Sequence, residues 1–196
     1  MLFDTHAHYD DDQFDPDREA LLASLPERGV GLVVNPGCTV ASSRTAVELA
    51  HRFPHIYAAV GIHPENCGDF RPEHLTEIRA LAQEDKVVAI GEIGLDYYWP
   101  ENPPRDLQPQ VLRQQLALAQ ELQLPVIIHD RDAHADTMDI VREFSRVRGV
   151  FRRVRGNGPG AGGSGLVPVL QRGSYLQKRP QGPGGHPGRP HGAADD

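Results

Sequence analysis

Residues 87–96 read VVAIGEIGLD, an apolar run that contains one carboxylate, Glu92, and ends at a second, Asp96. A short apolar run of this kind is typical of a strand buried in a parallel sheet. Apolar residues recur at helical spacing on both sides of it, in residues 72–85 and 107–122. The stretch therefore predicts a strand flanked by two helices, which is the repeating unit of α/β folds.

The same alternation of strand and helix patterns continues from the N-terminus to Phe151. Strands are predicted at residues 1–8, 30–36, 56–63, 87–95 and 125–130, with another starting at Gly149. Helices are predicted at residues 17–28, 41–53, 72–85, 107–122 and 133–144. This repeat implies a parallel sheet covered by helices, either an open doubly wound sheet or a closed barrel.

Polar residues at the ends of the predicted strands favour the barrel. They are His6, His8, His63, Glu92 and His129. Sites built from the carboxyl ends of several strands are typical of the (β/α)8 barrel, whereas open sheets concentrate their chemistry at one switch point. We therefore expect an α/β fold of the (β/α)8 TIM-barrel class, of which about the first six βα units are present.

The composition changes abruptly at Arg152. The last 45 residues include twelve Gly and six Pro and show no sustained apolar periodicity, which predicts a disordered segment. This segment carries a charge of +5, whereas residues 1–151 carry −12. The expected domains are an incomplete barrel at residues 1–151 and a basic Gly/Pro-rich tail at residues 152–196.

The charge and the apolar runs also bear on partners and location. An acidic body argues against binding nucleic acid through a broad basic surface, although a bound metal ion can hold a phosphate locally. No run is long and apolar enough to cross a bilayer, and the first ten residues lack the features of a secretory signal. Cys38 and Cys67 have no Cys-x-x-Cys partner and are expected to be reduced thiols. We expect a cytoplasmic protein with no membrane and no obligate protein partner.

Several strand-end residues are of types that bind divalent metals. His6 and His8 are two apart on an extended strand, so both imidazoles project from one face and can hold one ion. Glu92 lies at the mouth of a buried strand, where a carboxylate needs a cation; bridging two ions is the preferred interpretation over a salt bridge to an arginine. His129 follows an apolar triplet and is predicted to be a further ligand.

Other residues near the strand ends are candidates for contact with a substrate. His63 either contacts a phosphate or caps its loop. Arg131 either contacts a phosphate or pairs with Asp132, and the ion pair is favoured. Tyr97 and the two aromatic residues after it either stack on a base or pack within their loop. The remaining histidines of the body are expected on the solvated surface: His51, His55, His74 and His134.

The motifs at these positions resemble, in order and in spacing, those of the TatD-related deoxyribonucleases. They are FDTHAH at residues 3–8, GIHP at 61–64, GEIGLDYY at 91–98 and PVIIH at 125–129. The resemblance covers residues 1 to about 151. It implies a TIM barrel, two divalent metal ions (Mg, Zn or Mn) and hydrolysis of DNA phosphodiester bonds by a metal-activated water.

The resemblance also implies a role for each matching residue. His6 and His8 would hold one metal, Glu92 would bridge both ions, and His129 would bind the other. The expected catalytic residues are Glu92 and His63. The expected contacts with DNA as substrate are His63, Tyr97 and Arg131.

The chain departs from the family's pattern after Phe151. It has neither the His-Cys-Phe-Ser-Gly motif expected after a sixth strand nor the Glu-Thr-Asp motif expected near the last strand. Reading the codons of the tail one nucleotide later permits family-like segments, such as Ala-Trp-Tyr-Leu-Ser-Phe over residues 165–170. The C-terminal part is therefore expected to be missing or frameshifted, and the literal chain to have little or no nuclease activity and poor solubility.

Two other functions remain open. An amidohydrolase-type enzyme acting on C–N or ester bonds shares the His-x-His pattern on its first strand; a carboxylated lysine on the fourth strand would favour it, but this chain has Glu92 there. The second alternative is an inactive metal-binding remnant, which would show metal affinity without turnover.

Overall fold

The computed structural model describes residues 1–144 and 149–153. These residues form one parallel sheet of six strands, hydrogen-bonded in sequence order. The strands are β1 (Leu2–Asp4), β2 (Val30–Pro36), β3 (Ile56–Val60), β4 (Val87–Asp96), β5 (Val126–Arg131) and β6 (Gly149–Arg153). Because an open doubly wound sheet reverses its strand order at a switch point, the sequential order is that of a barrel arc.

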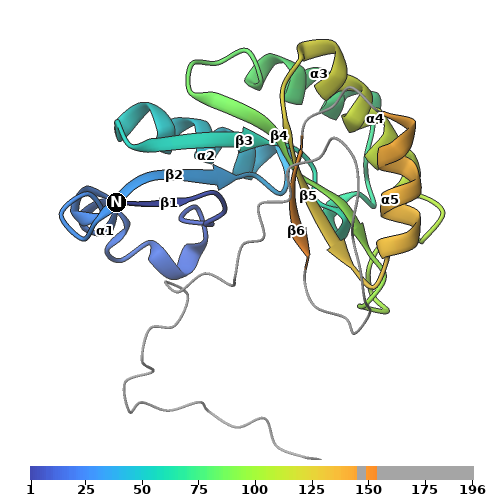
Figure 1. The fold of residues 1–196 in the computed structure, drawn as a ribbon, viewed down its shortest axis with the longest axis horizontal. Coiled ribbons are helices and arrows are strands. Elements are labelled where there is room, and N and C mark those ends of the chain that lie inside the picture. The colour runs from blue at the N-terminus through green and yellow to red at the C-terminus, as the bar shows by residue number, and fades with distance from the viewer. Residues whose placement is uncertain (145–148, 154–196) are drawn as a thin grey trace, which may run out of the picture.

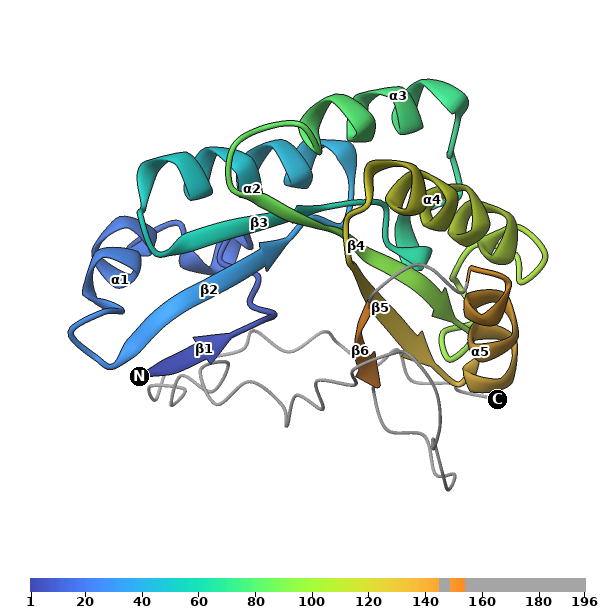
Figure 2. The same cartoon turned by 45° about the horizontal axis from the view of Figure 1, so that its top comes forward.

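Helices alternate with the strands, and α2 to α5 lie along one face of the curled sheet (Figures 1 and 2). The α-helices are α1 (Arg18–Ser24), α2 (Val40–Arg52), α3 (Pro72–Leu81), α4 (Gln108–Leu122) and α5 (His134–Glu143). Two 3-10 helices, η1 (Asp12–Phe14) and η2 (Pro64–Asn66), follow β1 and β3. The predicted class is confirmed: the described residues are the first six strands of a TIM-type barrel with their helices.

Two apolar clusters occupy opposite faces of the sheet. Consecutive strand residues alternate between them: Ile128 joins the cluster that contains the helices, and Ile127 joins the other. The helix-side cluster is large and includes Leu22, Ile78 and Leu116, each with no exposed surface. The opposite cluster holds the buried residues Val34, Ala59, Ala89 and Ile127. This alternation follows from the two-residue period of a strand and places the smaller cluster on the barrel's inner face.

Local signals account for several element boundaries. Thr39 begins α2 with a capping box, in which its side chain accepts from the backbone of Ser42 and the Ser42 side chain accepts in return. Pro72 occupies the first position of α3, where its missing N–H costs nothing. The first strand, predicted at residues 1–8, is much shorter and ends at Asp4. His6 and His8 therefore lie in the segment after β1 and not on a strand.

Most of the predicted tail at residues 152–196 lies outside the described residues; Arg152 and Arg153 belong to β6. Within residues 1–144 and 149–153, no helix is both long enough and apolar enough to span a membrane.

Candidate metal centre

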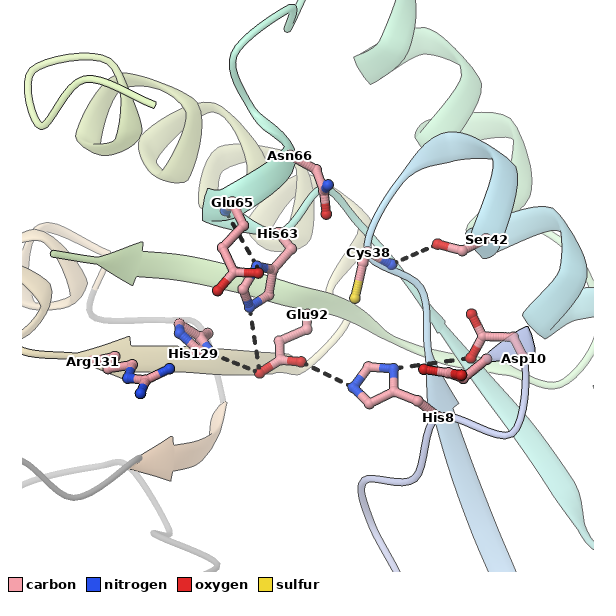
Figure 3. A pocket seen from close by; sticks show the side chains of 11 residues that line it. His8, Asp10, Cys38, Ser42, His63, Glu65, Asn66, Glu92, His129 and Arg131 are labelled. Carbon is pink, nitrogen blue, oxygen red and sulfur yellow. Dashed lines mark hydrogen bonds and ion pairs between the residues drawn. The ribbon is translucent and has the colours of Figure 1, made fainter. Parts of the chain in front are cut away.

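Glu92 lies at the centre of a cluster of four histidines, three of which are drawn in Figure 3. Its Oε2 is 2.9 Å from Nε2 of His6 and 3.3 Å from Nε2 of His8. Its Oε1 is 3.1 Å from Nδ1 of His129 and 4.0 Å from Nε2 of His63. Each carboxylate oxygen thus faces a different pair of histidines, which is the arrangement that a carboxylate bridging two ions requires.

The donor set fits divalent ions. Two groups of three side chains have potential ligand atoms within 4.8 Å of one another: His6, His8 and Glu92 form one group, and His63, Glu92 and His129 form the other. Imidazole nitrogen and carboxylate oxygen are ligands for Zn²⁺ and related ions. Glu92 is only 1% exposed, and a carboxylate buried to this extent needs cations around it. The four predicted ligands therefore lie together, although the number and identity of the ions stay predictions.

The first two histidines lie together in the segment that follows β1, where the backbone N–H of Ala7 still donates to the carbonyl of Val34 on β2. The backbone N–H of His6 donates to Oδ1 of Asp4 across 3.0 Å, directly after β1 ends. Nε2 of His6 and Nε2 of His8 then lie 3.0 Å apart. The imidazoles of His6 and His8 do converge, as predicted, but the strand predicted at residues 1–8 is wrong beyond Asp4.

Asp10 and Asn35 lie next to His8, on the side of its Nδ1 atom. Oδ1 of Asp10 lies 3.9 Å from Nδ1 of His8 and accepts a hydrogen bond from Nδ2 of Asn35 at 2.8 Å. Asn35 is fully buried in β2, and its Oδ1 accepts from the backbone N–H of Tyr9. Carboxylates behind metal-binding histidines commonly orient the ring. Sequence reasoning missed both residues; an asparagine inside the apolar run 30–36 was the available signal.

His63 is arranged as a hydrogen-bond donor toward the centre. Its Nδ1 accepts from the backbone N–H of Glu65 across 3.2 Å as the N-cap of η2, so the ring proton of the neutral form lies on Nε2. Burial lowers the pKa of His63 to about 3, despite the opposing effect of Glu92. In this tautomer the neutral ring directs Nε2–H at the cluster, where it can donate to an anionic substrate. His63 therefore caps its loop through Nδ1, and this leaves Nε2 available for a phosphate contact.

His129 differs from His63 because it lies between two carboxylates. Burial opposes its charged form, but hydrogen bonds to Asp96 and Glu92 outweigh burial and raise the pKa of His129 to about 9. The Nε2 of His129 is 2.9 Å from Oδ2 of Asp96, which can keep the ring proton there and leave Nδ1 to bind a metal. Contacts with His129, His6 and His8 in turn hold the pKa of Glu92 well below its usual range, although burial alone would raise it.

The raised pKa of His129 predicts proton release on metal binding. At pH 7 the metal-free imidazole is charged, and Nδ1 must lose its proton before it can bind an ion. The apparent affinity for Mn²⁺ or Zn²⁺ is therefore expected to rise about tenfold per pH unit from pH 7 to about pH 9 and then to level off. Calorimetric titration in two buffers of different ionisation enthalpy measures the proton directly. An affinity that does not change between pH 7 and pH 9 would contradict this assignment.

Two buried glutamines of α4 hold the loops that carry the site. Gln115 accepts from the backbone N–H of Ile62 at 2.8 Å and donates to its carbonyl at 3.0 Å. Gln108, two turns earlier on the same face, makes the corresponding pair of bonds with the backbone of Asp96. The two glutamine side chains thus hydrogen-bond the backbone N–H and carbonyl of Ile62, next to His63, and of Asp96. These bonds take the place of pairing with a neighbouring strand. Sequence reasoning missed them; two glutamines seven apart on the apolar face of a predicted helix were the signal.

A pocket opens over Glu92 (Figure 3). Arg131 lines it, and among the residues that the structure describes it forms no ion pair, so the favoured pairing with Asp132 is not observed. Tyr97 does not line the pocket: its hydroxyl donates to Oδ2 of Asp136, and Arg105 stacks on its ring. The lining residues are His8, Asp10, Asp11, Cys38, Ser42, His63, Glu65, Asn66, Glu92, His129 and Arg131.

One of the histidines expected on the surface is buried. His55 is 9% exposed, and its Nε2 hydrogen-bonds with the carbonyl of Leu22 on α1. The prediction of a solvated residue is wrong because α1 packs over the start of β3, a contact that no local pattern reveals. His134 is half-buried, and its Nδ1 lies 2.7 Å from Oδ2 of Asp130, joining the start of α5 to the end of β5.

Comparison with known proteins agrees with this geometry. The family model described as TatD related DNase matches residues 3–160. An uncharacterized metal-dependent hydrolase, YabD of Bacillus subtilis, is 43% identical over 143 residues, which are 73% of this chain and 56% of that protein. A protein of Salmonella typhimurium named 3'-5' ssDNA/RNA exonuclease TatD is 36% identical over 133 residues, 68% of this chain and 51% of that one. The chain thus spans about half the length of the curated relatives it matches.

A solved structure supports the fold in the same way. The crystal structure of YjjV, a TatD homologue from Escherichia coli K12, superposes with a TM-score of 0.73 at 31% sequence identity. The superposition covers 80% of this chain and 61% of that one. The described strands and helices therefore correspond to part of a longer barrel.

Proposed function

The chain belongs to the TatD-related DNase family of metal-dependent hydrolases, and on that premise we propose that it contributes the metal centre of an enzyme that cleaves DNA phosphodiester bonds. The observation that carries the proposal is the placement of Glu92, with one oxygen facing His6 and His8 and the other facing His129. Two divalent ions bound there would supply an activated water and would stabilise the charge that develops on the phosphate. The preferred substrate is single-stranded DNA, by analogy with relatives named ssDNA/RNA exonucleases.

The protein's own side chains have separate tasks in this scheme. Glu92 keeps the two halves of the centre at a set distance and remains ionised because three histidines contact it. Neutral His63 donates from Nε2 to a non-bridging phosphate oxygen. Arg131 offers a positive charge at the pocket, which otherwise bears the carboxylates of Asp10, Asp11 and Glu65. The Asp96 carboxylate orients His129 throughout.

We further propose that the literal 196-residue chain is impaired, since residues 152–196 do not carry the family's later motifs. In this proposal residues 1–151 form an incomplete barrel domain. The protein is proposed to be cytoplasmic and to need no obligate protein partner.

The test compares two proteins: the 196-residue chain and the product of the same gene read one nucleotide later after the codon for Phe151. Each is freed of metal and supplied with Mg²⁺, Mn²⁺ or Zn²⁺, and cleavage of an end-labelled single-stranded oligonucleotide is followed. We expect both to bind metal and the shifted-frame product to cleave at least about 100-fold faster, a gap of about 3 kcal/mol in the barrier. Metal-dependent cleavage of an N-acyl amino acid but not of DNA would instead favour the amidohydrolase alternative. Rapid DNA cleavage by the 196-residue chain would overturn the proposed impairment.

A further inference from the structure

Three side chains stack beside the metal pocket. The Arg131 guanidinium carbon lies 3.9 Å from the ring centroid of Tyr98 and 5.0 Å from that of Trp99. The two rings meet edge to face, with centroids 4.6 Å apart. Arg131 also lines the pocket that contains Glu92 and His129. The stacked group, which we call the aromatic platform (Tyr98, Trp99 and Arg131), thus adjoins the centre on the β5 side.

Backbone contacts set the position of the platform relative to the centre. The N–H of Tyr98 donates to Oδ1 of Asp96 across 3.0 Å, while Oδ2 of the same carboxylate lies 2.9 Å from Nε2 of His129. One carboxylate therefore contacts both a predicted metal ligand and the platform. On the other side, the N–H of Tyr97 donates to the carbonyl of Arg131 across 2.9 Å. The platform cannot move far without disturbing the ends of β4 and β5.

The rings of Tyr98 and Trp99 are exposed, although the neighbouring Tyr97 is held by a hydrogen bond. Tyr98 is 49% exposed and Trp99 is 41% exposed, whereas Tyr97 is half-buried, with its hydroxyl bonded to Asp136. The other large apolar side chains exposed in the described part of the chain are Met1, Leu2 and Phe3, at the β1 edge of the sheet. Exposed aromatic rings beside a polar pocket are a typical surface for ligands with flat faces.

We propose that the platform binds an unpaired nucleobase of a nucleic-acid strand whose phosphate lies at the metal centre. The inference rests on the proposed function and names a part of the substrate that the metals do not hold. A base would stack on the face of one of the two rings, which are nearly perpendicular, with the other ring at its edge, and the in-plane N–H groups of Arg131 would donate to a phosphate of the same strand. Since every base has a π face, the contact is independent of sequence.

The charge around the pocket favours this occupant. Asp10, Asp11 and Glu65 line the pocket and would repel the phosphates of a strand lying across them. Arg131 is the one lysine or arginine among the described residues that line this pocket, and it is part of the platform. A strand is therefore attracted on the platform side, and its nearest base meets two exposed rings there. A paired base cannot offer its face to them without leaving its stack, so the platform selects single strands over duplex.

The experiment uses Trp99, the single tryptophan of the sequence, as its own reporter. The 196-residue chain is titrated with the octamer dT8 and with an abasic octamer that has the same phosphates but no bases, with and without Mg²⁺. We expect dT8 to quench the fluorescence of Trp99 and the abasic strand to leave it unchanged. Equal quenching of Trp99 by both strands would overturn the proposal. So would binding of dye-labelled dT8, detected by fluorescence anisotropy, that leaves the Trp99 fluorescence unchanged.

Variants separate stacking from charge. Tyr98→Ala and Trp99→Ala are expected to weaken dT8 binding about 5-fold to about 100-fold by anisotropy, whereas Tyr98→Phe and Trp99→Phe keep most of the affinity. Arg131→Gln is expected to weaken binding, and Arg105→Gln, which removes the same charge from the neighbouring Tyr97 stack, is the matched control. An equal loss in both arginine variants would mean that only net charge matters and would refute the platform.

The outcome for the platform is distinguishable from that for the enzyme. If dT8 quenches Trp99 but the shifted-frame product cleaves no DNA, the platform stands and the proposed hydrolysis fails. If that product cleaves DNA while base-dependent quenching is absent, the hydrolysis stands and the platform fails.

Discussion

The variant Glu92→Gln is expected to lose at least about 1000-fold in metal-dependent phosphodiester hydrolysis, measured in the shifted-frame product, together with most of its bound metal. Glutamine has nearly the same shape, so packing in this 1%-exposed position is kept. It replaces one carboxylate oxygen with an NH2 group and removes the negative charge that faces His6 and His129. One amide oxygen cannot bridge two ions.

Metal content per chain, measured by mass spectrometry after dialysis, checks this prediction independently of turnover and can also be done on the 196-residue chain. Glu143→Gln makes the same chemical change at the surface, where Glu143 pairs with Arg113, and is expected to leave metal content unaltered. A Glu92→Gln protein that retains its metal and its rate would show that Glu92 is an ordinary buried ion-pair partner.

The second large effect is expected at Gly94, where a methyl group would prevent β4 from pairing with β5. Gly94 lies opposite His129 in the ladder, and a Cβ attached to it would overlap the carbonyl oxygen of His129. Its φ of +155° adds backbone strain for any other residue. Gly94→Ala is therefore expected to cost about 4 kcal/mol or more of folding free energy, which approaches the whole stability of a domain at the low end of the usual range, about 5 kcal/mol.

Urea unfolding, or soluble yield where the variant does not fold, measures this loss. Gly29→Ala is the matched control, because Gly29 has a positive φ of +83° but open space, with no atom within 4 Å, where a Cβ would lie. Gly29→Ala is expected to lower the free energy of unfolding by only about 1 kcal/mol, because alanine is strained in the left-handed backbone conformation. Similar losses in the two variants would show that backbone strain and not the contact with His129 makes Gly94 necessary.

Much of this architecture was predictable from local patterns. The run at residues 87–95 corresponds to β4, and all six strand candidates are present in the predicted order. Glu92 and His129 were identified from their places beside apolar runs, and they do meet across β4 and β5. Burial and strand period are properties of a few consecutive residues, so a single sequence carries them.

Other parts depended on contacts between distant segments. The strand predicted at residues 1–8 ends at Asp4, and His6 and His8 converge in the segment after it. His55 is buried by α1, and Arg131, which lines the pocket, stacks on Tyr98 and Trp99 and not on Tyr97. In each case the position of the side chain depends on a loop whose path is set by packing against another element.

The order of the elements, the parallel barrel class and the types of metal-binding side chains were determined by the sequence itself, because periodicity and strand-end polarity are local. Only the tertiary structure decided which nitrogen faces which oxygen. That Nδ1 of His129 meets Glu92 while its Nε2 meets Asp96, and that Nδ1 of His63 accepts from Glu65, depend on strand register and loop geometry. The two contacts of His129 join residues 37 and 33 positions apart, and no short stretch of sequence contains them; the contact of His63 with Glu65 is local but depends on the backbone path of η2.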